Sequence, residues 1–154
     1  ANYTHRHKQG AQDLFNILLN MGYATIRGYT TSFLSASGLA PSIGMLHKAR
    51  GNHMALSSDL MEPFRYIVER VATTLLKRNI INHTHLEEKQ GEIKLNAGGR
   101  RLFYTALSNQ LETKRQPKYG GQKQTIIQHM QTQSNSLSHW VHSQEKTFNV
   151  WRMH

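Results

Sequence analysis

Two of the nine acidic residues in this chain, Asp59 and Glu62, lie three positions apart at the start of a predicted helix. On a helix this spacing places both carboxylates on one face. His47 lies twelve residues before Asp59, and a loop of that length can fold its imidazole back over the helix start. One histidine and two carboxylates suit a divalent ion, because carboxylates favour Mg²⁺ or Mn²⁺ and imidazole favours Mn²⁺ or Zn²⁺. Such an ion polarises a phosphoryl oxygen of DNA and lowers the pKa of a bound water or 3′-hydroxyl.

The same two acids also fit a purely structural role. The segment Asp59-Leu-Met-Glu62 has the spacing of a capping box, and acids in a first helical turn are favoured by the helix dipole. Pro63 argues against the cap, because it would occupy the first position whose N–H must bond back to the N-cap carbonyl. Regular helix would then begin nearer residues 60–62, with Asp59 before it. The residues alone therefore leave the metal site and the cap open as alternatives.

The elements expected to position this cluster are helices, and the predicted fold class is mainly α, with minor extended segments. Apolar residues at helical spacing predict a multi-helix domain over residues 1–154. Its predicted parts are a polar basic arm (1–12), a helix from Asp13 to a stop at Gly38, helices over about 59–79, 97–113 and 124–143, a short strand at 92–95 and a basic loop at 114–124. Asn96 is the expected cap of the third helix.

The composition of the chain favours an anionic partner. Nineteen Lys and Arg against nine acids give a formal charge of +10, and such a surface attracts polyanions, nucleic acid above all. No run of 18 apolar residues exists, so we expect no membrane partner. The chain has no cysteine, which excludes disulfides and thiolate metal sites and is compatible with a reducing cytoplasm.

Three motifs resemble one known family. In chain order they are N-I-L-L-N-M-G-Y (16–23), G-L-A-P-S-I-G-M-L-H (38–47) and D-L-M-E-P-F-R (59–65). They are similar in order and spacing to the CRISPR-associated integrase, the Cas-one family, which inserts new spacers into CRISPR arrays. A weaker similarity extends through residues 96–111 and the last helix. The match therefore covers essentially the whole chain with the helical catalytic domain of the family.

The resemblance implies an endonuclease and integrase of CRISPR antiviral defence in a prokaryotic cytoplasm. His47 and Glu62 match the metal ligands of the family, and Asp59 matches an acidic partner, with Mg²⁺ or Mn²⁺ as the cofactor. The implied reaction is attack of a spacer 3′-hydroxyl on a repeat phosphodiester. The implied partners are double-stranded DNA (spacer precursor and CRISPR repeat), a second copy of the protein and a Cas-two protein. We expect the DNA backbone to be held by basic residues, namely Arg27, Lys48, Arg50, Arg65, Lys114, Arg115 and Lys118.

The chain departs from the family pattern at one ligand. The family has a further metal-binding glutamate on a helix well before the first motif, whereas here Asp13 is the sole acid before Asn16. The β-rich domain that builds the family dimer also has no counterpart. We therefore expect a fragment or a part of a larger polypeptide, such as a fusion to a reverse transcriptase. Two other functions stay open, a catalytically silent DNA-binding or assembly module and a related transposon integrase.

Overall fold

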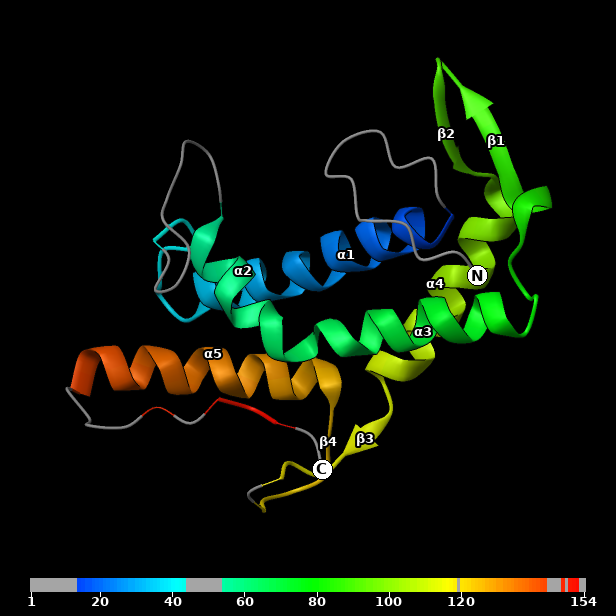
Figure 1. The fold of residues 1–154 in the computed structure, drawn as a ribbon. Helices are drawn as coiled ribbons and strands as arrows, with labels where there is room; N and C mark the ends of the chain where they lie inside the picture. Colours follow the sequence, from blue (N-terminus) through cyan, green and yellow to red (C-terminus); the bar gives the residue numbers. More distant parts are fainter. Residues whose placement is uncertain (1–13, 44–53, 119, 144–147, 149, 153–154) are drawn as a thin grey trace. The chain divides into compact units, whose positions relative to one another are not determined.

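The computed structural model describes residues 14–43, 54–118, 120–143, 148 and 150–152. Within them the fold is mainly α-helical, as the sequence predicted, and the strands are short (Figure 1). The chain divides into two compact units. Unit 1 comprises Ala1–Ala24 and Tyr66–Gln110, and unit 2 comprises Thr25–Arg65 and Leu111–His154. The predicted arm at 1–12 lies outside the described residues.

Among the described residues, no helix is both long enough and apolar enough to cross a lipid bilayer.

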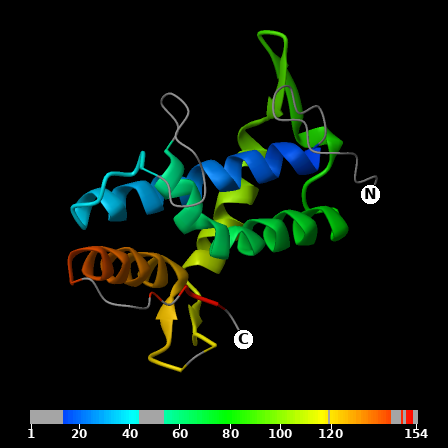
Figure 2. The ribbon, with the colours of Figure 1, turned by 60° about the vertical axis from the view of Figure 1, so that its left-hand side comes forward.

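Unit 1 contains the first part of α1 (Leu14–Ala36), nearly all of α3 (Arg65–Lys77) and α4 (Ala97–Leu111), and a hairpin between these last two helices. The hairpin consists of β1 (Leu86–Lys89) and β2 (Glu92–Leu95), paired antiparallel. The predicted strand at 92–95 is thus confirmed. Gln90 and Gly91 form its two-residue turn with φ of 56° and 77°, as a hairpin turn with two left-handed residues requires. Figures 1 and 2 both show this hairpin extending as a narrow ribbon.

The core of unit 1 forms where α1 and α3 approach each other closely. A Cβ added at Gly22 would clash with Cγ1 of Val68 and lie 3.0 Å from its Cγ2. Glycine is therefore needed at this position for the two helices to pack. Fully or almost fully buried apolar side chains from every part of the unit complete the core: Leu18, Val68, Ile81, Leu95, Phe103 and Leu107.

The start of α4 is fixed by side-chain capping. The Oδ1 atom of Asn96 accepts a hydrogen bond of 2.9 Å from the N–H of Gly99, so the predicted cap is confirmed. A short 3₁₀ helix, η2 (His83–His85), precedes the hairpin, and Asn82 caps it. Nδ1 of His85 accepts the Asn82 N–H at 3.3 Å. The imidazole of His85 therefore has a local structural role.

Unit 2 contains the second part of α1, α2 (Ala55–Met61), the 3₁₀ helix η1 (Glu62–Phe64) and α5 (Ile126–Ser143). Two short strands, β3 (Lys114–Arg115) and β4 (Gln124–Thr125), pair at the two ends of the predicted basic loop. The predicted stop of the first helix is also confirmed. Gly38 has a φ of 76°, and the Leu39 N–H bonds back to the Leu34 carbonyl at 3.0 Å, as at a glycine-terminated helix end.

One apolar cluster joins the helices of unit 2. Its buried members are Leu34 of α1, Leu56 and Leu60 of α2, and Leu137 of α5. Leu39, Trp140 and Phe148 pack against it. Because Leu56 and Leu60 are one helical turn apart, they turn one face of α2 toward α1 and α5.

An aromatic group anchors the last described residues to unit 2. The ring of Trp151 stacks on the ring of Phe64 with centroids 4.8 Å apart. The centroid of the His129 ring lies 5.3 Å from that of Trp151. Nε2 of the buried His129 contacts the carbonyl oxygen of Arg115 at 2.8 Å. The carboxamide oxygen of Gln133 accepts the backbone N–H of Trp151 at 3.0 Å. These contacts connect β3, α5 and the segment that follows α5.

The single helix predicted over 59–79 is wrong. The chain instead forms α2, then one 3₁₀ turn, then α3. Pro63 accounts for the interruption, because it has no N–H to donate to the carbonyl of Asp59 four residues earlier. The N–H of Glu62 instead donates a hydrogen bond to the Asp59 carbonyl, three residues earlier, as in a 3₁₀ helix. The tighter turn satisfies the carbonyl and re-enters α-helix at Arg65.

Candidate metal centre and DNA-binding surface

Asp59 is the fifth residue of α2, not a residue at its start. The N-cap of α2 is Met54, which makes no side-chain capping bond. Both local expectations for Asp59 are therefore wrong, since it is neither the N-cap nor a residue before the helix. The capping-box alternative is removed, and the Asp59 side chain is partly buried. Glu62 follows three residues later on the 3₁₀ turn, so the two carboxylates share one side of the helical segment.

The orientation of α2 depends on a carbonyl from the preceding loop. The oxygen of Pro41 accepts the N–H groups of Leu56 at 2.9 Å and Ser57 at 3.3 Å. These are among the N–H groups that a helix start leaves without a helical partner. The Pro41 carbonyl thus does the work of a side-chain cap. It also ties the end of α1, through residues 38–41, to the first turn of the helix that carries Asp59.

Two threonines of α1 fix α2 from its buried side. The hydroxyl of Thr30, which has no solvent exposure, shares its one hydrogen between the Arg27 carbonyl at 3.0 Å and the Ser57 carbonyl at 3.1 Å. The neighbouring Thr31 hydroxyl donates to Ser57 Oγ at 2.8 Å. Ser57 is itself completely buried. These hydrogen bonds fix the position of α2 along α1, and its rotation about its own axis, more precisely than the apolar cluster alone, because hydrogen bonds are directional.

Glu62 forms an ion pair with Arg65, the last residue of the third motif. Nη1 of Arg65 lies 2.9 Å from Oε1 and 3.1 Å from Oε2. The two side chains are 29% and 40% exposed, so the pair is at the surface. An ionised carboxylate has about four lone-pair sites, and one N–H group leaves several of them open. Glu62 can therefore accept an additional cation without losing Arg65.

The third predicted metal ligand, His47, lies outside the described residues. Within the part of the chain that is described, no three His, Cys, Asp or Glu side chains are grouped as a metal site would need. The two carboxylates of Asp59 and Glu62 are hard oxygen donors that fit Mg²⁺ or Mn²⁺. They would supply two of the three predicted ligands, and the whole site stays a prediction.

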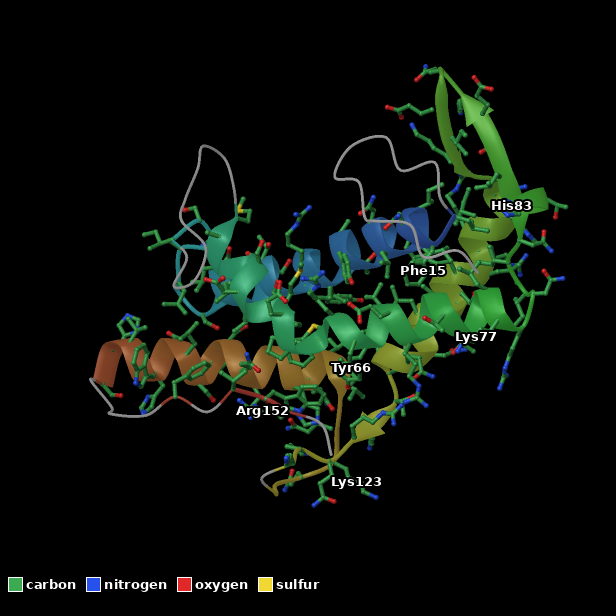
Figure 3. All side chains as sticks on the ribbon, viewed as in Figure 1. Phe15, Tyr66, Lys77, His83, Lys123 and Arg152 are labelled. Atoms are coloured by element: carbon green, nitrogen blue, oxygen red, sulfur yellow. The ribbon has the colours of Figure 1, made fainter. Side chains whose placement is uncertain are left out.

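The predicted DNA-binding residues that can be placed all belong to unit 2. Arg27 is exposed on α1, and Arg65 begins α3. Lys114 and Arg115 form β3, and the N–H of Lys118 donates to the Arg152 carbonyl at 2.9 Å. Figure 3 labels Lys123 and Arg152 in this same basic part of unit 2. Lys48 and Arg50 lie outside the described residues.

The positioning residues Pro41, Thr30 and Ser57 were missed by sequence reasoning. Pro41 was read only as a helix stop, although a proline carbonyl accepts hydrogen bonds as well as any other. Thr30 lies next to an apolar helical stripe, and a hydroxyl inside a buried face needs a partner. That signal indicates a polar contact, but it does not tell which segment provides the partner.

The fold and the placed residues define a helical domain that carries two carboxylates on α2 and η1 and basic residues on α1, α3 and β3. The family model of the CRISPR-associated protein Cas1 matches residues 1–109. The chain therefore belongs to the Cas1 family.

Known relatives agree with this membership. A CRISPR-associated endonuclease Cas1 of Thermus thermophilus is 34% identical over 107 residues, which are 69% of this chain and 34% of the relative. A second, from Francisella tularensis subsp. novicida, is 38% identical over 76 residues, or 49% of this chain and 24% of the relative. The chain thus spans about a third or less of the length of these two curated relatives.

Solved structures share the fold across nearly the whole chain. A partial Cas6-RT-Cas1–Cas2 complex matches 99% of this chain and 46% of the solved chain, with 30% identity and a TM-score of 0.82. A casposase bound to integration product matches 97% of this chain and 45% of its own, with a TM-score of 0.87. At 22% identity, the second likeness concerns the fold alone.

Proposed function

We propose that this chain is part of a metal-dependent DNA integrase of CRISPR adaptation, with Asp59, Glu62 and His47 at its metal site. The observation that carries the proposal is the placement of Asp59 and Glu62. Asp59 lies in α2 and Glu62 begins the 3₁₀ turn that contains Pro63. Their three-residue spacing puts both carboxylates on one side of the helical segment, in a chain of the Cas1 family.

Within the proposed site, each residue has a distinct task. Asp59 and Glu62 would hold Mg²⁺ or Mn²⁺ through carboxylate oxygens, and His47 would add one imidazole nitrogen. The ion, when bound, supplies positive charge that stabilises a phosphoryl group under attack. Arg65 orients the Glu62 carboxylate through their ion pair. Thr30 and Pro41 hold α2 rigidly, which matters because a ligand that moves by an ångström loses much of its effect.

The proposed reaction is a transesterification. The 3′-hydroxyl oxygen of a spacer strand forms a bond to a repeat phosphorus, and the bond from that phosphorus to its leaving 3′-oxygen breaks. The attacking hydroxyl loses a proton and the leaving oxygen gains one. Because one phosphodiester is exchanged for another, the step needs no energy-rich co-reactant. The basic residues of unit 2 would hold the phosphate backbone in place.

The proposed partners follow from the same family membership. Double-stranded DNA, as spacer precursor and as repeat, is the substrate. The solved Cas6-RT-Cas1–Cas2 complexes support a Cas2 protein as a partner, and a second copy of the protein completes the assembly. A related transposon integrase is the second candidate, because such an enzyme would use the same proposed metal site and DNA backbone contacts. The genes beside this one distinguish the two.

The test is a strand-transfer assay with the full-length gene product, Mn²⁺ and labelled DNA with free 3′-hydroxyl ends. We expect His47→Ala and Glu62→Gln each to reduce joined product by more than about tenfold, since loss of a group that only orients a metal ligand already costs about 10–100-fold. Glu88→Gln is the matched control, because it removes an exposed carboxylate of the hairpin in unit 1. It should join DNA like the wild type.

Joining at the wild-type level in both site variants would overturn the metal-site assignment. DNA binding that weakens with salt, without metal-dependent joining by the wild type, would instead identify a silent DNA-binding module.

A further inference from the structure

A polar groove of about 370 Å³ lies in unit 1 between α3 and α4. Three residues of the α3 side, Arg70, Thr74 and Arg78, form one wall, and Asn109 and Gln110 of α4 belong to the other. Val71, Leu75 and Ala106 also line the groove. No acidic residue lines it. None of these residues is among the predicted DNA-binding residues, which belong to unit 2 where they can be placed.

Both arginines of the groove are exposed to solvent. Among the described residues neither guanidinium forms an ion pair. Glu69, the acid next to Arg70 in the chain, accepts a 2.8 Å hydrogen bond from the hydroxyl of Tyr23. Its carboxylate is thus held by α1. The groove therefore has an uncompensated positive charge beside neutral hydrogen-bonding groups.

The spacing of the two arginines fits a repeating anion. Arg70, Thr74 and Arg78 follow at intervals of four residues, so they lie along one side of the helix. The N–H of Arg78 still bonds to the Thr74 carbonyl at 3.0 Å, which continues the helical geometry past Lys77. Eight residues of helix correspond to about 12 Å. Each strand of a duplex rises about 3.4 Å along the helix axis per nucleotide, so two arginines this far apart can contact different phosphates of one strand.

Stabilisation of the helix end explains only part of this arrangement. Basic residues in the last turn interact favourably with the helix dipole, and this accounts for Lys77 and Arg78. It does not account for Arg70, which lies near the middle of α3. Lys77, labelled at the end of α3 in Figure 3, does not line the groove. Lys77 therefore separates the two explanations experimentally.

We propose that the groove between α3 and α4 binds the phosphate backbone of a DNA strand through Arg70 and Arg78, without a metal ion. Thr74 and Asn109 provide additional hydrogen bonds to phosphate oxygens. Because the contacts are to phosphate, binding is independent of base sequence. The inference rests on the proposed function in one respect, that DNA is the polyanion which this protein meets. It assigns a second DNA contact, made by unit 1.

The test measures binding of a short fluorescent DNA duplex to the full-length gene product in EDTA, at several salt concentrations. The variant is Arg70→Gln/Arg78→Gln. Its matched control is Lys77→Gln/Lys89→Gln, which removes the same charge from exposed positions of unit 1 that do not line the groove. We expect the groove variant to weaken binding about tenfold or more and to lower the salt slope by about 1.8, or about 0.9 for each lost phosphate contact. The control should change the slope by less than about half of that.

Equal affinity and equal salt slope in the groove variant and its control would overturn the proposal. Two duplexes of unrelated sequence should give the same loss, and a loss confined to one of them would also contradict backbone binding. The result is separable from the metal-site test. If the groove variant binds DNA more weakly in EDTA while His47→Ala and Glu62→Gln join DNA at the wild-type level, only the metal-site proposal is overturned. If joining depends on the metal site but the groove variant binds DNA like its control, only the groove proposal is overturned.

Discussion

Arg65 contacts both carboxylate oxygens of Glu62 through a single nitrogen, at 2.9 Å and 3.1 Å. The two residues are three apart: Glu62 begins the 3₁₀ turn that Pro63 imposes, and Arg65 directly follows it. The turn thus brings a cation to the same carboxylate that is the proposed metal ligand. Since the pair is partly exposed, it orients Glu62 more than it stabilises the fold.

The first prediction concerns this ion pair. We expect Arg65→Gln to lower the free energy of unfolding by less than about 1 kcal/mol, because water and salt screen a surface pair. A double-mutant cycle with Glu62→Gln should give a coupling of about 0.2–0.5 kcal/mol. Urea denaturation measures both values. A coupling above about 2 kcal/mol would show that the pair is desolvated and structural.

The second prediction concerns the contact that holds α2. Thr30→Val replaces a buried hydroxyl by a methyl group of similar size and leaves the Ser57 carbonyl without this donor. We expect a loss of about 1–3 kcal/mol in the free energy of unfolding, and weaker metal-dependent joining because Asp59 is carried by the same helix. Ser32→Ala is the control, because it removes an exposed α1 hydroxyl that bonds only to the Gly28 carbonyl one helical turn earlier. Water can replace that bond, so the cost should stay below about 1 kcal/mol.

The third prediction compares two glycines of α1. A Cβ at Gly22 would clash with the buried Val68, whereas nothing lies within 4 Å of a Cβ at Gly28. We expect Gly22→Ala to destabilise the protein by about 1–3 kcal/mol through overpacking. Gly28→Ala should instead stabilise it by up to about 1 kcal/mol, because alanine favours the helix. Thermal denaturation checks the opposite signs. Adding Val68→Ala to Gly22→Ala should recover part of the loss, and no recovery would show that the clash is elsewhere.

The sequence by itself determined the features that depend on local chemistry or on ordered motifs. Helical periodicity gave the mainly α fold, Asn96 gave a cap, and Gly38 gave a helix end. Each of these depends on residues within about one helical turn, so a local pattern is sufficient to encode it. The three motifs led to the Cas1 family and to Asp59 and Glu62 as a pair.

Only the tertiary structure decided how that pair is held. Pro63 was correctly read as incompatible with a cap at Asp59, yet the helix begins four residues before Asp59 instead of after it. The earlier start is possible because the Pro41 carbonyl accepts the first N–H groups of α2, fifteen and sixteen positions along the chain. Thr30 reaches Ser57 over 27 positions. Partners so distant are chosen by the packing of α1, α2 and α5, because a hydrogen-bonding group in a buried face takes whichever complementary group the fold brings to it.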